Sequence, residues 1–260
     1  MEPLAATGVT AGHPAWTCFK FDPAIADTPE QLLQQFIAAS DFPCVGAKSA
    51  LKQGRLTTYR ARALDSAWND VEIQDRLMQF AWAYRSEPTL FTSFAVVFEG
   101  PDTLDETGFE QHMWARIQSL TAKDSWLGHA HDDRVSADPD DPHFSLSFGG
   151  EAFFVVGLHP RASRPARRFA HPVMVFNLHE QFEMLRAQGR YEKLRSAIID
   201  RDVALAGSPN PMLARHGSVS EARQYSGRAV DAAWACPFHR DDSGPDAAIA
   251  NRLDHSEEVS

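Results

Sequence analysis

The feature of the sequence that most constrains the fold is a set of four short segments rich in Phe and Val. Each segment is bounded by Gly, Pro or Asn, which is typical of β-strands. They are LFTSFAVVFEG (90–100), HFSLSFGG (143–150), EAFFVVGLH (151–159) and PVMVFN (172–177). Gly149 and Gly150 join the second segment to the third, and this pair predicts either a tight hairpin turn or a bulge. We therefore expect a sheet at the centre of the fold.

Helical periodicity surrounds these segments. Apolar residues recur at helical spacing in 28–40, 66–85, 105–124 and 178–202, and the last stretch has a break near Gly189. The first stretch begins with Thr28 as a cap and Pro29 at the first helical position. Helices before, between and after the strands predict an α+β fold, in which helices pack a mixed or antiparallel sheet of about four to six strands.

The chain is predicted to contain one domain, over residues 16–238. Residues 1–15 are small, polar and interrupted by Pro and Gly, which indicates a loose N-terminal tail. Residues 239–260 have the charge and low hydrophobicity of a disordered C-terminal tail. The acidic stretch HAHDDRVSADPDDPH (129–143) is predicted to be an exposed loop. Its first residues resemble part of a zinc-hydrolase signature, but Arg134 stands where that signature requires histidine, so we expect no zinc here.

Composition and charge exclude several classes of protein. The 35 acidic residues outnumber the 25 basic ones, whereas a non-specific nucleic-acid binder needs a broad basic face, so no nucleic-acid partner is expected. No apolar run approaches the roughly 20 residues of a membrane-spanning helix. The three widely spaced cysteines form no disulfide framework, and the first residues lack the pattern of a signal peptide. We therefore expect a cytoplasmic protein with no membrane partner.

A basic stretch, GLHPRASRPARRF (157–169), follows the third predicted strand and stands out in a chain of net charge −10. It contains His159 and four arginines, Arg161, Arg164, Arg167 and Arg168. Such a stretch is a solvated loop, a nucleic-acid patch, or a pocket for a dianionic cofactor. The cluster is too local for nucleic acid, which leaves the other two interpretations.

Five blocks of the chain, in order, resemble the YqcI/YcgG family. They are FPCVGAKSAL (42–51), FSLSFGGEAFFVVGLHPRASRPARRF (144–169), MVFNLHEQFEMLR (174–186), NPMLARHGSVSEARQYSGR (210–228) and WACPF (234–238). Members of this family include haem-dependent N-hydroxylases that act on arginine or on cyclic guanidines. The resemblance implies a haem b cofactor, O₂, a small guanidino substrate with free arginine as the leading candidate, and a separate electron-donor protein. Two alternatives stay open: a non-catalytic haem-binding protein for storage or sensing, and a non-haem protein of the same fold.

If a haem is bound, its propionates need hydrogen bonds from arginine. Arg161, Arg164, Arg167 and Arg168 are the candidates, and Arg164 and Arg168 are preferred. The alternative for all four is a solvated loop or ion pairs with acidic helices.

The haem iron needs an axial ligand. His159 ranks first because imidazole is the commonest haem ligand, and it lies where a strand meets a loop. Cys44 ranks second because it precedes an apparent helix, whose N-terminal N–H groups would favour the thiolate that assists O–O cleavage. Cys236, followed by Pro237, ranks third, and His216 is an outside candidate. The alternatives are a structural histidine and inert buried thiols.

A guanidinium substrate needs a carboxylate, because its planar N–H donors match two carboxylate oxygens. Glu151, directly after the double glycine, is the first choice, and Glu221 is the second. If Glu151 pairs instead with surface arginines, the non-catalytic alternative is favoured. Polar residues that could complete the lining of the pocket are Asn177, Gln181, Asn210, Gln224 and Tyr225.

Overall fold

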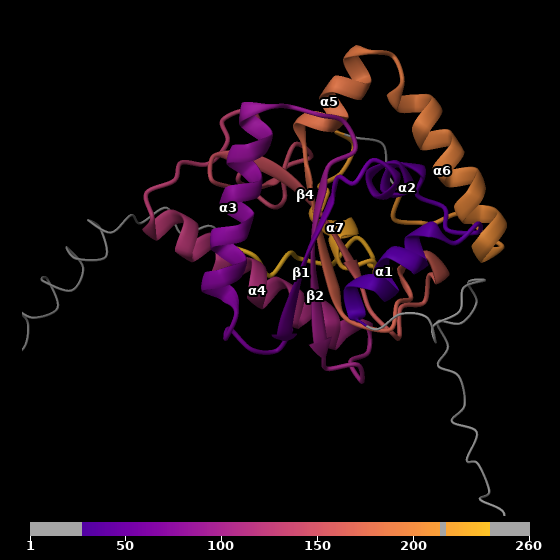
Figure 1. Cartoon of the computed structure of the whole chain (residues 1–260), viewed down its shortest axis with the longest axis horizontal. Helices are drawn as coiled ribbons and strands as arrows, with labels where there is room; N and C mark the ends of the chain where they lie inside the picture. The colour runs from indigo at the N-terminus through magenta and orange to yellow at the C-terminus, as the bar shows by residue number, and fades with distance from the viewer. Residues whose placement is uncertain (1–27, 214–216, 240–260) are drawn as a thin grey trace, which may run out of the picture.

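The computed structural model describes residues 28–213 and 217–239 (Figure 1). The two predicted tails, 1–15 and, apart from His239, 239–260, lie outside the described residues, and so does the candidate ligand His216.

The centre of the fold is an open five-stranded mixed sheet in the order β1-β2-β5-β4-β3. β1 and β2 are parallel, and the remaining neighbours are antiparallel. The strands are β1 (Leu56–Ala63), β2 (Ser93–Gly100), β3 (Leu146–Phe148), β4 (Glu151–Leu158) and β5 (Val173–Leu178). The predicted α+β class is therefore confirmed. The patterns above do not predict β1, because its sequence LTTYRARA lacks Phe and Val and is only partly buried.

Helices cover both faces of the sheet. They are α1 (Pro29–Ala38), α2 (Val45–Lys52), α3 (Asp70–Ser86), α4 (Glu106–Trp126), α5 (Glu180–Ala187), α6 (Tyr191–Ala206) and α7 (Ala222–Tyr225), with a 3₁₀ turn, η2, at Pro165–Arg167. The start of α1 is a capping box, in which the hydroxyl of Thr28 accepts from the backbone N–H of Gln31 and the Gln31 side chain accepts from the N–H of Thr28. Gly189, at a φ of 65°, separates α5 from α6, as the predicted break requires.

The two faces of the sheet carry separate hydrophobic clusters. α3 and α4 lie on one side, and α1, α2 and α6 lie on the other (Figure 1). Phe109 and Ile117 of α4 belong to the first cluster. Phe36 of α1 belongs to the second, together with Leu158 of β4 and the partly buried Cys44. Candidate residues that pack in different clusters therefore lie on different faces of the sheet.

The double glycine forms the hairpin turn between β3 and β4. Gly149 and Gly150 both have positive φ, 62° and 77°, the combination of a type I′ turn. A Cβ atom on Gly149 would lie 2.8 Å from the Cε of Met78, the flexible end of that side chain, so the positive φ is the main reason that glycine is required here. Of the two expected structures, the tight turn is the one that forms.

One edge of β4 is covered by α7 instead of by another strand. β3 pairs only with residues 151–153 of β4. Beyond that point the Tyr225 hydroxyl donates to the carbonyl of Phe153 at 3.3 Å, and Arg167 donates to the carbonyl of Gly157 at 2.9 Å. These bonds satisfy backbone groups that an open strand edge would leave exposed, and they fix α7 beside β4.

Candidate functional site

A pocket lies between β4, α5, α6 and the segment that leads into α7. Its volume is about 190 Å³. Aromatic and aliphatic side chains form most of its walls, and among them are Phe154, Phe182, Leu194, Ile198, Ile199 and Leu213. The polar and charged side chains that line it are Arg186, Tyr191, Arg195, Glu221 and Gln224. We call this cavity the Glu221 pocket. An apolar pocket with a few convergent polar groups is the usual form of a small-molecule site.

Glu221 is the acidic residue among the described side chains that line this pocket. It directly precedes α7 and is 9% exposed. The hydroxyl of Ser145 donates to its Oε2 at 3.4 Å in a buried environment. A carboxylate in a pocket whose walls include Phe154 and Phe182 can bind a guanidinium group through two hydrogen bonds, in a setting where little water competes. The second-choice carboxylate of the sequence thus lies in a pocket of suitable chemistry.

Two arginines stand on the helical side of the Glu221 pocket. The Arg186 guanidinium lies over the ring of Tyr191, 4.4 Å from its centre, and pairs with Glu183. Arg195 donates to the carbonyl of Leu213 at 3.3 Å. The sequence patterns did not identify either arginine, because each occupies an ordinary position on an amphipathic helix. Their role in the pocket follows only from the way α5 and α6 pack against β4.

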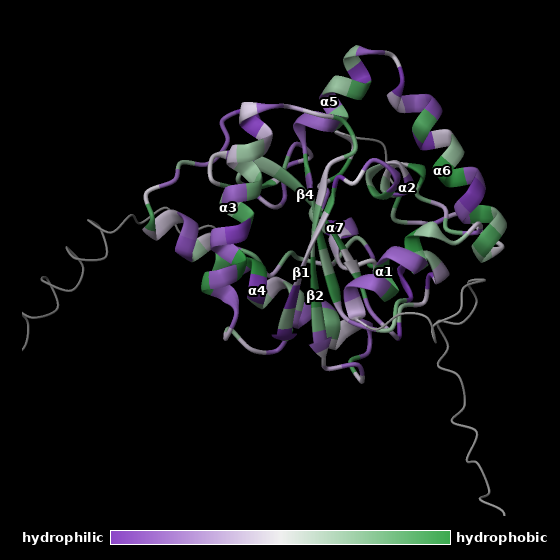
Figure 2. Ribbon diagram, in the orientation of Figure 1, coloured by the Kyte–Doolittle hydropathy of each residue, from purple (hydrophilic) through white to green (hydrophobic). Residues whose placement is uncertain are grey.

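Helix α6 covers the pocket loosely. Its one buried residue is Asp202, and its inward apolar residues, such as Leu194 and Ile198, are only partly buried. Figure 2 shows hydrophobic and hydrophilic bands alternating along α6, on the outside of the molecule. A bound ligand would cover apolar surface that this helix leaves accessible.

The basic stretch folds back onto the protein. Arg164 pairs with Asp202 of α6 and donates to the carbonyl of Ser208 at 3.1 Å. Arg168 donates to the carbonyls of Ala162 and Ser163, at 2.8 and 2.9 Å, within its own loop. These side chains, the preferred propionate ligands, are thus engaged with protein acceptors. Arg161 is exposed.

Arg167 points inward and binds three carbonyls. Its Nη1 donates to Gly157 at 2.9 Å and to Tyr225 at 3.3 Å, and its Nη2 donates to Gln224 at 3.2 Å. Burial lowers the pKa of Arg167 to about 10, while the charges of Cys44 and Asp202 act in the opposite direction. The guanidinium therefore stays charged at neutral pH and holds α7 against β4.

Glu151 lies outside the Glu221 pocket and binds two arginines of the protein. Its Oε1 accepts from the Nε of Arg85 at 2.8 Å, and its Oε2 accepts from Nη2 of Arg134 at 2.8 Å. Both arginine side chains are about half exposed, at 53% and 47%. The first-choice carboxylate is thus already bound by guanidinium groups, which is the arrangement that favours the non-catalytic alternative.

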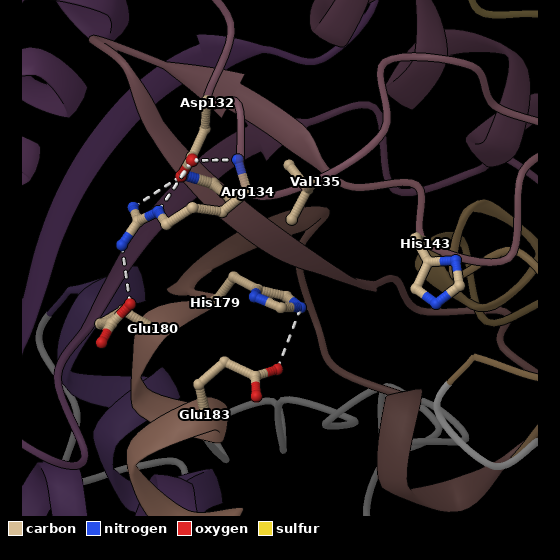
Figure 3. A pocket seen from close by; sticks show the side chains of 8 residues that line it. Asp132, Arg134, Val135, His143, His179, Glu180 and Glu183 are labelled. Atoms are coloured by element: carbon tan, nitrogen blue, oxygen red, sulfur yellow. Dashed lines mark hydrogen bonds and ion pairs between the residues drawn. The ribbon is translucent and has the colours of Figure 1, made fainter.

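Arg134 joins three carboxylates from different parts of the chain, and Figure 3 shows two of them, Asp132 and Glu180. Besides Glu151 of β4, it binds Asp132 in the acidic loop at 2.6 Å and Glu180 of α5 at 2.7 Å. Burial acts to raise the pKa of Asp132, but hydrogen bonds and charge from Arg134 outweigh it and leave this pKa below its ordinary value. The adjacent cavity, of about 260 Å³, is lined largely by charged side chains. This network attaches the acidic loop to the sheet and explains why Arg134 occupies its position.

His159 is enclosed on the α4 face of the sheet. It is 1% exposed, and its ring stacks on Phe109 with centres 4.4 Å apart. Burial lowers its pKa to about 4; the charge of Glu106 acts to raise this pKa, and the charge of Arg167 acts to lower it further. The imidazole is therefore neutral at pH 7. Phe154 of the Glu221 pocket alternates with Phe153 along β4 and therefore points away from the face that carries His159, although its ring also packs on Tyr225 of the α4-face cluster at the strand edge.

The pH dependence of the free energy of unfolding tests whether His159 is buried and neutral. The unfolded chain takes up a proton on this side chain below about pH 6.5, and the folded chain does so only near pH 4. The stability contributed by the neutral imidazole is thus present above pH 6.5 and lost as the pH falls toward 4, by about 3 kcal/mol. Urea unfolding at about pH 7 and about pH 4 should show a smaller loss for His159→Phe than for the wild type. Equal losses would show that His159 is not the group responsible.

Cys44 lies on the opposite face, at the start of α2. Its Sγ caps the helix by accepting from the backbone N–H of Ala47 at 3.4 Å, as predicted from its place before a helix. Burial raises the pKa of the thiol, while hydrogen bonds from Ala47 and Gly46 and the charge of Arg167 act to lower it. Arg167 also binds the carbonyl of Gln224, which lines the Glu221 pocket. Cys44 itself is not among the described residues that line the Glu221 pocket.

Cys236 is packed in the cluster on the α4 face, where burial raises its pKa to about 12. A protonated, enclosed thiol of this kind is inert. Among the described residues, no group of three or more His, Cys, Asp or Glu side chains is arranged to hold a metal ion. Within the same ranges, no helix combines the length and apolar character that a bilayer-spanning segment requires.

Comparison with known proteins identifies the family. Residues 33–239 match the model of the YqcI/YcgG family, which includes the Glu221 pocket, Cys44 and the basic stretch. Searches of curated proteins and of solved structures give no significant match. The family match covers most of the chain and agrees with the five blocks seen in the sequence. The chain therefore belongs to the YqcI/YcgG family.

Proposed function

We propose that this protein is a haem-dependent monooxygenase that N-hydroxylates a guanidino compound. In the reaction, one oxygen atom of O₂ enters an N–H group of the guanidine to form N–OH, and the other leaves as water. Two electrons and two protons balance the reaction. A separate electron-donor protein supplies the electrons, and the protons come from solvent.

The observation that carries the proposal is the position of Glu221. Its carboxylate lines a largely apolar pocket whose walls include Phe154 and Phe182, and a guanidinium is the cation whose geometry it matches best. We assign the anchoring role to Glu221 because it lines this pocket, whereas Glu151 lies outside the pocket and binds Arg85 and Arg134. This placement favours an enzyme over a storage or sensor protein, since a protein that only binds haem needs no carboxylate in the pocket.

The chemistry of the side chains fits a haem beside this pocket. The walls are aromatic and aliphatic. Arg186 and Arg195 line the pocket and would exchange their present partners, Glu183 and the carbonyl of Leu213, for the propionates of a haem. Cys44 supplies a sulfur that already accepts a backbone N–H, as thiolate ligands of iron commonly do. A metal ion deprotonates a thiol that coordinates it. His159 is enclosed against Phe109 on the other face of the sheet, so we place Cys44 first among the candidate ligands.

The volume of the Glu221 pocket sets a condition on this proposal. Its 190 Å³ is below the range of about 300–1,000 Å³ found for sites of drug-sized ligands. Binding of a haem therefore requires α6 to lie further from β4. Such a displacement uncovers little fully buried apolar surface, since Asp202 is the one buried residue of α6, but it breaks the ion pair of Asp202 with Arg164.

When bound, the haem supplies oxygen activation, and the protein supplies binding, orientation and exclusion of water. Glu221 holds the guanidinium at a fixed place by accepting two N–H donors. The apolar walls of the pocket, Phe154 and Phe182 among them, limit the water that competes for the carboxylate. The Ser145 hydroxyl, which donates to Glu221, restricts the orientation of the carboxylate.

The absorption spectrum of the purified full chain after addition of haem tests the proposal. We expect a Soret band, a change in that band on addition of L-arginine, and formation of an N-hydroxyguanidine when O₂ and an electron donor are present. A Soret band without a response to guanidino compounds and without turnover would favour the storage or sensor alternative. No Soret band at all would leave the non-haem alternative.

A further inference from the structure

α7 is a short helix with few bonds of its own. It contains four residues, Ala222–Tyr225, and Glu221 at its start makes no capping bond from its side chain. A helix of this length satisfies almost none of its backbone groups internally. Its position, and therefore the position of Glu221, depends on bonds from other parts of the chain.

Arg167 supplies such bonds at the C-terminal end of α7. The carbonyls of Gln224 and Tyr225, which a helix end leaves without partners, accept from Nη2 and Nη1 at 3.2 and 3.3 Å. The same guanidinium donates to Gly157 of β4 at 2.9 Å. One side chain thus connects the last turn of the helix to the strand that carries Phe154.

The chain after α7 wraps closely around Arg167. Gly227 has a φ of 84°, and a Cβ atom there would lie 3.3 Å from Cγ of Arg167. Two further bonds help to place α7, from the Tyr225 hydroxyl to Phe153 and from the Ser226 hydroxyl to Glu110. Arg167 is distinct because it is charged and contacts the strand and two helix carbonyls together.

We propose that Arg167 is a positioning residue of the Glu221 pocket, which fixes α7 on β4 and so holds the Glu221 carboxylate where it receives a guanidinium. This inference rests on the proposed function of the pocket. Glu221 lies about one helical turn from the carbonyls that Arg167 holds, so a loosened helix end shifts the carboxylate relative to Phe154. A displacement of about 1 Å is enough to reduce catalysis on the order of a hundredfold.

The experiment compares Arg167→Met with Arg167→Lys in the full chain after haem addition. Titration calorimetry with L-arginine as the probe should show binding weakened about tenfold or more in Arg167→Met. Arg167→Lys should recover part of the affinity, since an ammonium can donate to these carbonyls but lacks the planar fork. Arg168→Met is the matched control, because Arg168 binds carbonyls of its own loop, and it should bind L-arginine as the wild type does.

Hydrogen exchange separates positioning from a general loss of stability. In Arg167→Met, amides in and directly after α7 should exchange faster while those of β4 and β5 keep their protection. If α7 keeps its protection and the affinity is unchanged, the inference is overturned. Uniformly faster exchange across β4, β5 and α7 would also overturn it, since Arg167 would then be a general stabiliser.

If the proposed function is wrong, the variants show a different pattern of L-arginine binding. If Glu221→Gln binds L-arginine as tightly as the wild type, the pocket is not the guanidinium site, whatever the Arg167 variants do. If Glu221→Gln loses binding and Arg167→Met does not, the site stands and the positioning role is wrong.

Discussion

Replacing Glu221 by Gln is expected to weaken the binding of L-arginine by about thirtyfold or more. The amide keeps the shape of the side chain but removes its charge and replaces one acceptor with a donor. Removing one member of a buried charge pair costs about 2–5 kcal/mol, and 1.4 kcal/mol is a tenfold change in affinity. Because Glu221 is 9% exposed and lies in an apolar pocket, water compensates little. Calorimetric titration of the haem-supplemented protein measures the change.

Glu151→Gln is the matched control for this prediction. Glu151 is a similarly buried carboxylate, but its oxygens are bound by Arg85 and Arg134 and it lies outside the Glu221 pocket. We expect this variant to lower the melting temperature while leaving the affinity for L-arginine unchanged. The reverse result, with binding lost in Glu151→Gln and kept in Glu221→Gln, would move the guanidinium site to the Arg134 network.

Replacing Cys44 by Ser is expected to abolish the thiolate signature of the ferrous–CO spectrum completely. The proposal gives the iron one sulfur ligand, and a hydroxyl is a poor substitute for a thiolate. The wild type should show the thiolate-type band, and His159→Phe should keep it, because His159 is stacked on Phe109 across the sheet from the pocket. The measurement is the reduced, CO-treated absorption spectrum of each variant.

Cys236→Ser serves as the thiol control. Cys236 is buried in the cluster on the α4 face with its pKa raised to about 12 by burial, so its loss should leave the spectrum unchanged. A histidine-type spectrum in the wild type that disappears in His159→Phe would contradict the assignment of Cys44 and restore the histidine to first place.

Local features of the sequence were sufficient for much of the secondary structure. Thr28 and Pro29 start α1, Gly189 separates α5 from α6, and the two glycines at 149 and 150 make the hairpin. Each depends on contacts among residues that are close in the chain, so the pattern carries the information directly. β1 was not predicted, because its own side chains are mostly polar or small and because its place in the sheet depends on pairing with β2, a distant segment of the chain.

The candidate site depends instead on contacts between residues that are far apart in the chain. The sequence identified Glu151 and Glu221 as carboxylates near glycine or polar segments, but only packing shows that Arg134, from a separate loop, binds the first and that α5 and α6 enclose the second.

The sequence alone identified the arginines of the basic stretch as a cluster, but it did not identify the residues that they bind. Arg164 meets Asp202, 38 residues away, and Arg167 meets Tyr225, 58 residues away. The amino-acid sequence by itself therefore determined the family, the α+β class and the chemical groups available to the protein. Tertiary structure decided which of those groups meet, because ion pairs and pocket walls form between residues that are distant in the chain, and no local pattern records the side of a sheet on which each one lies.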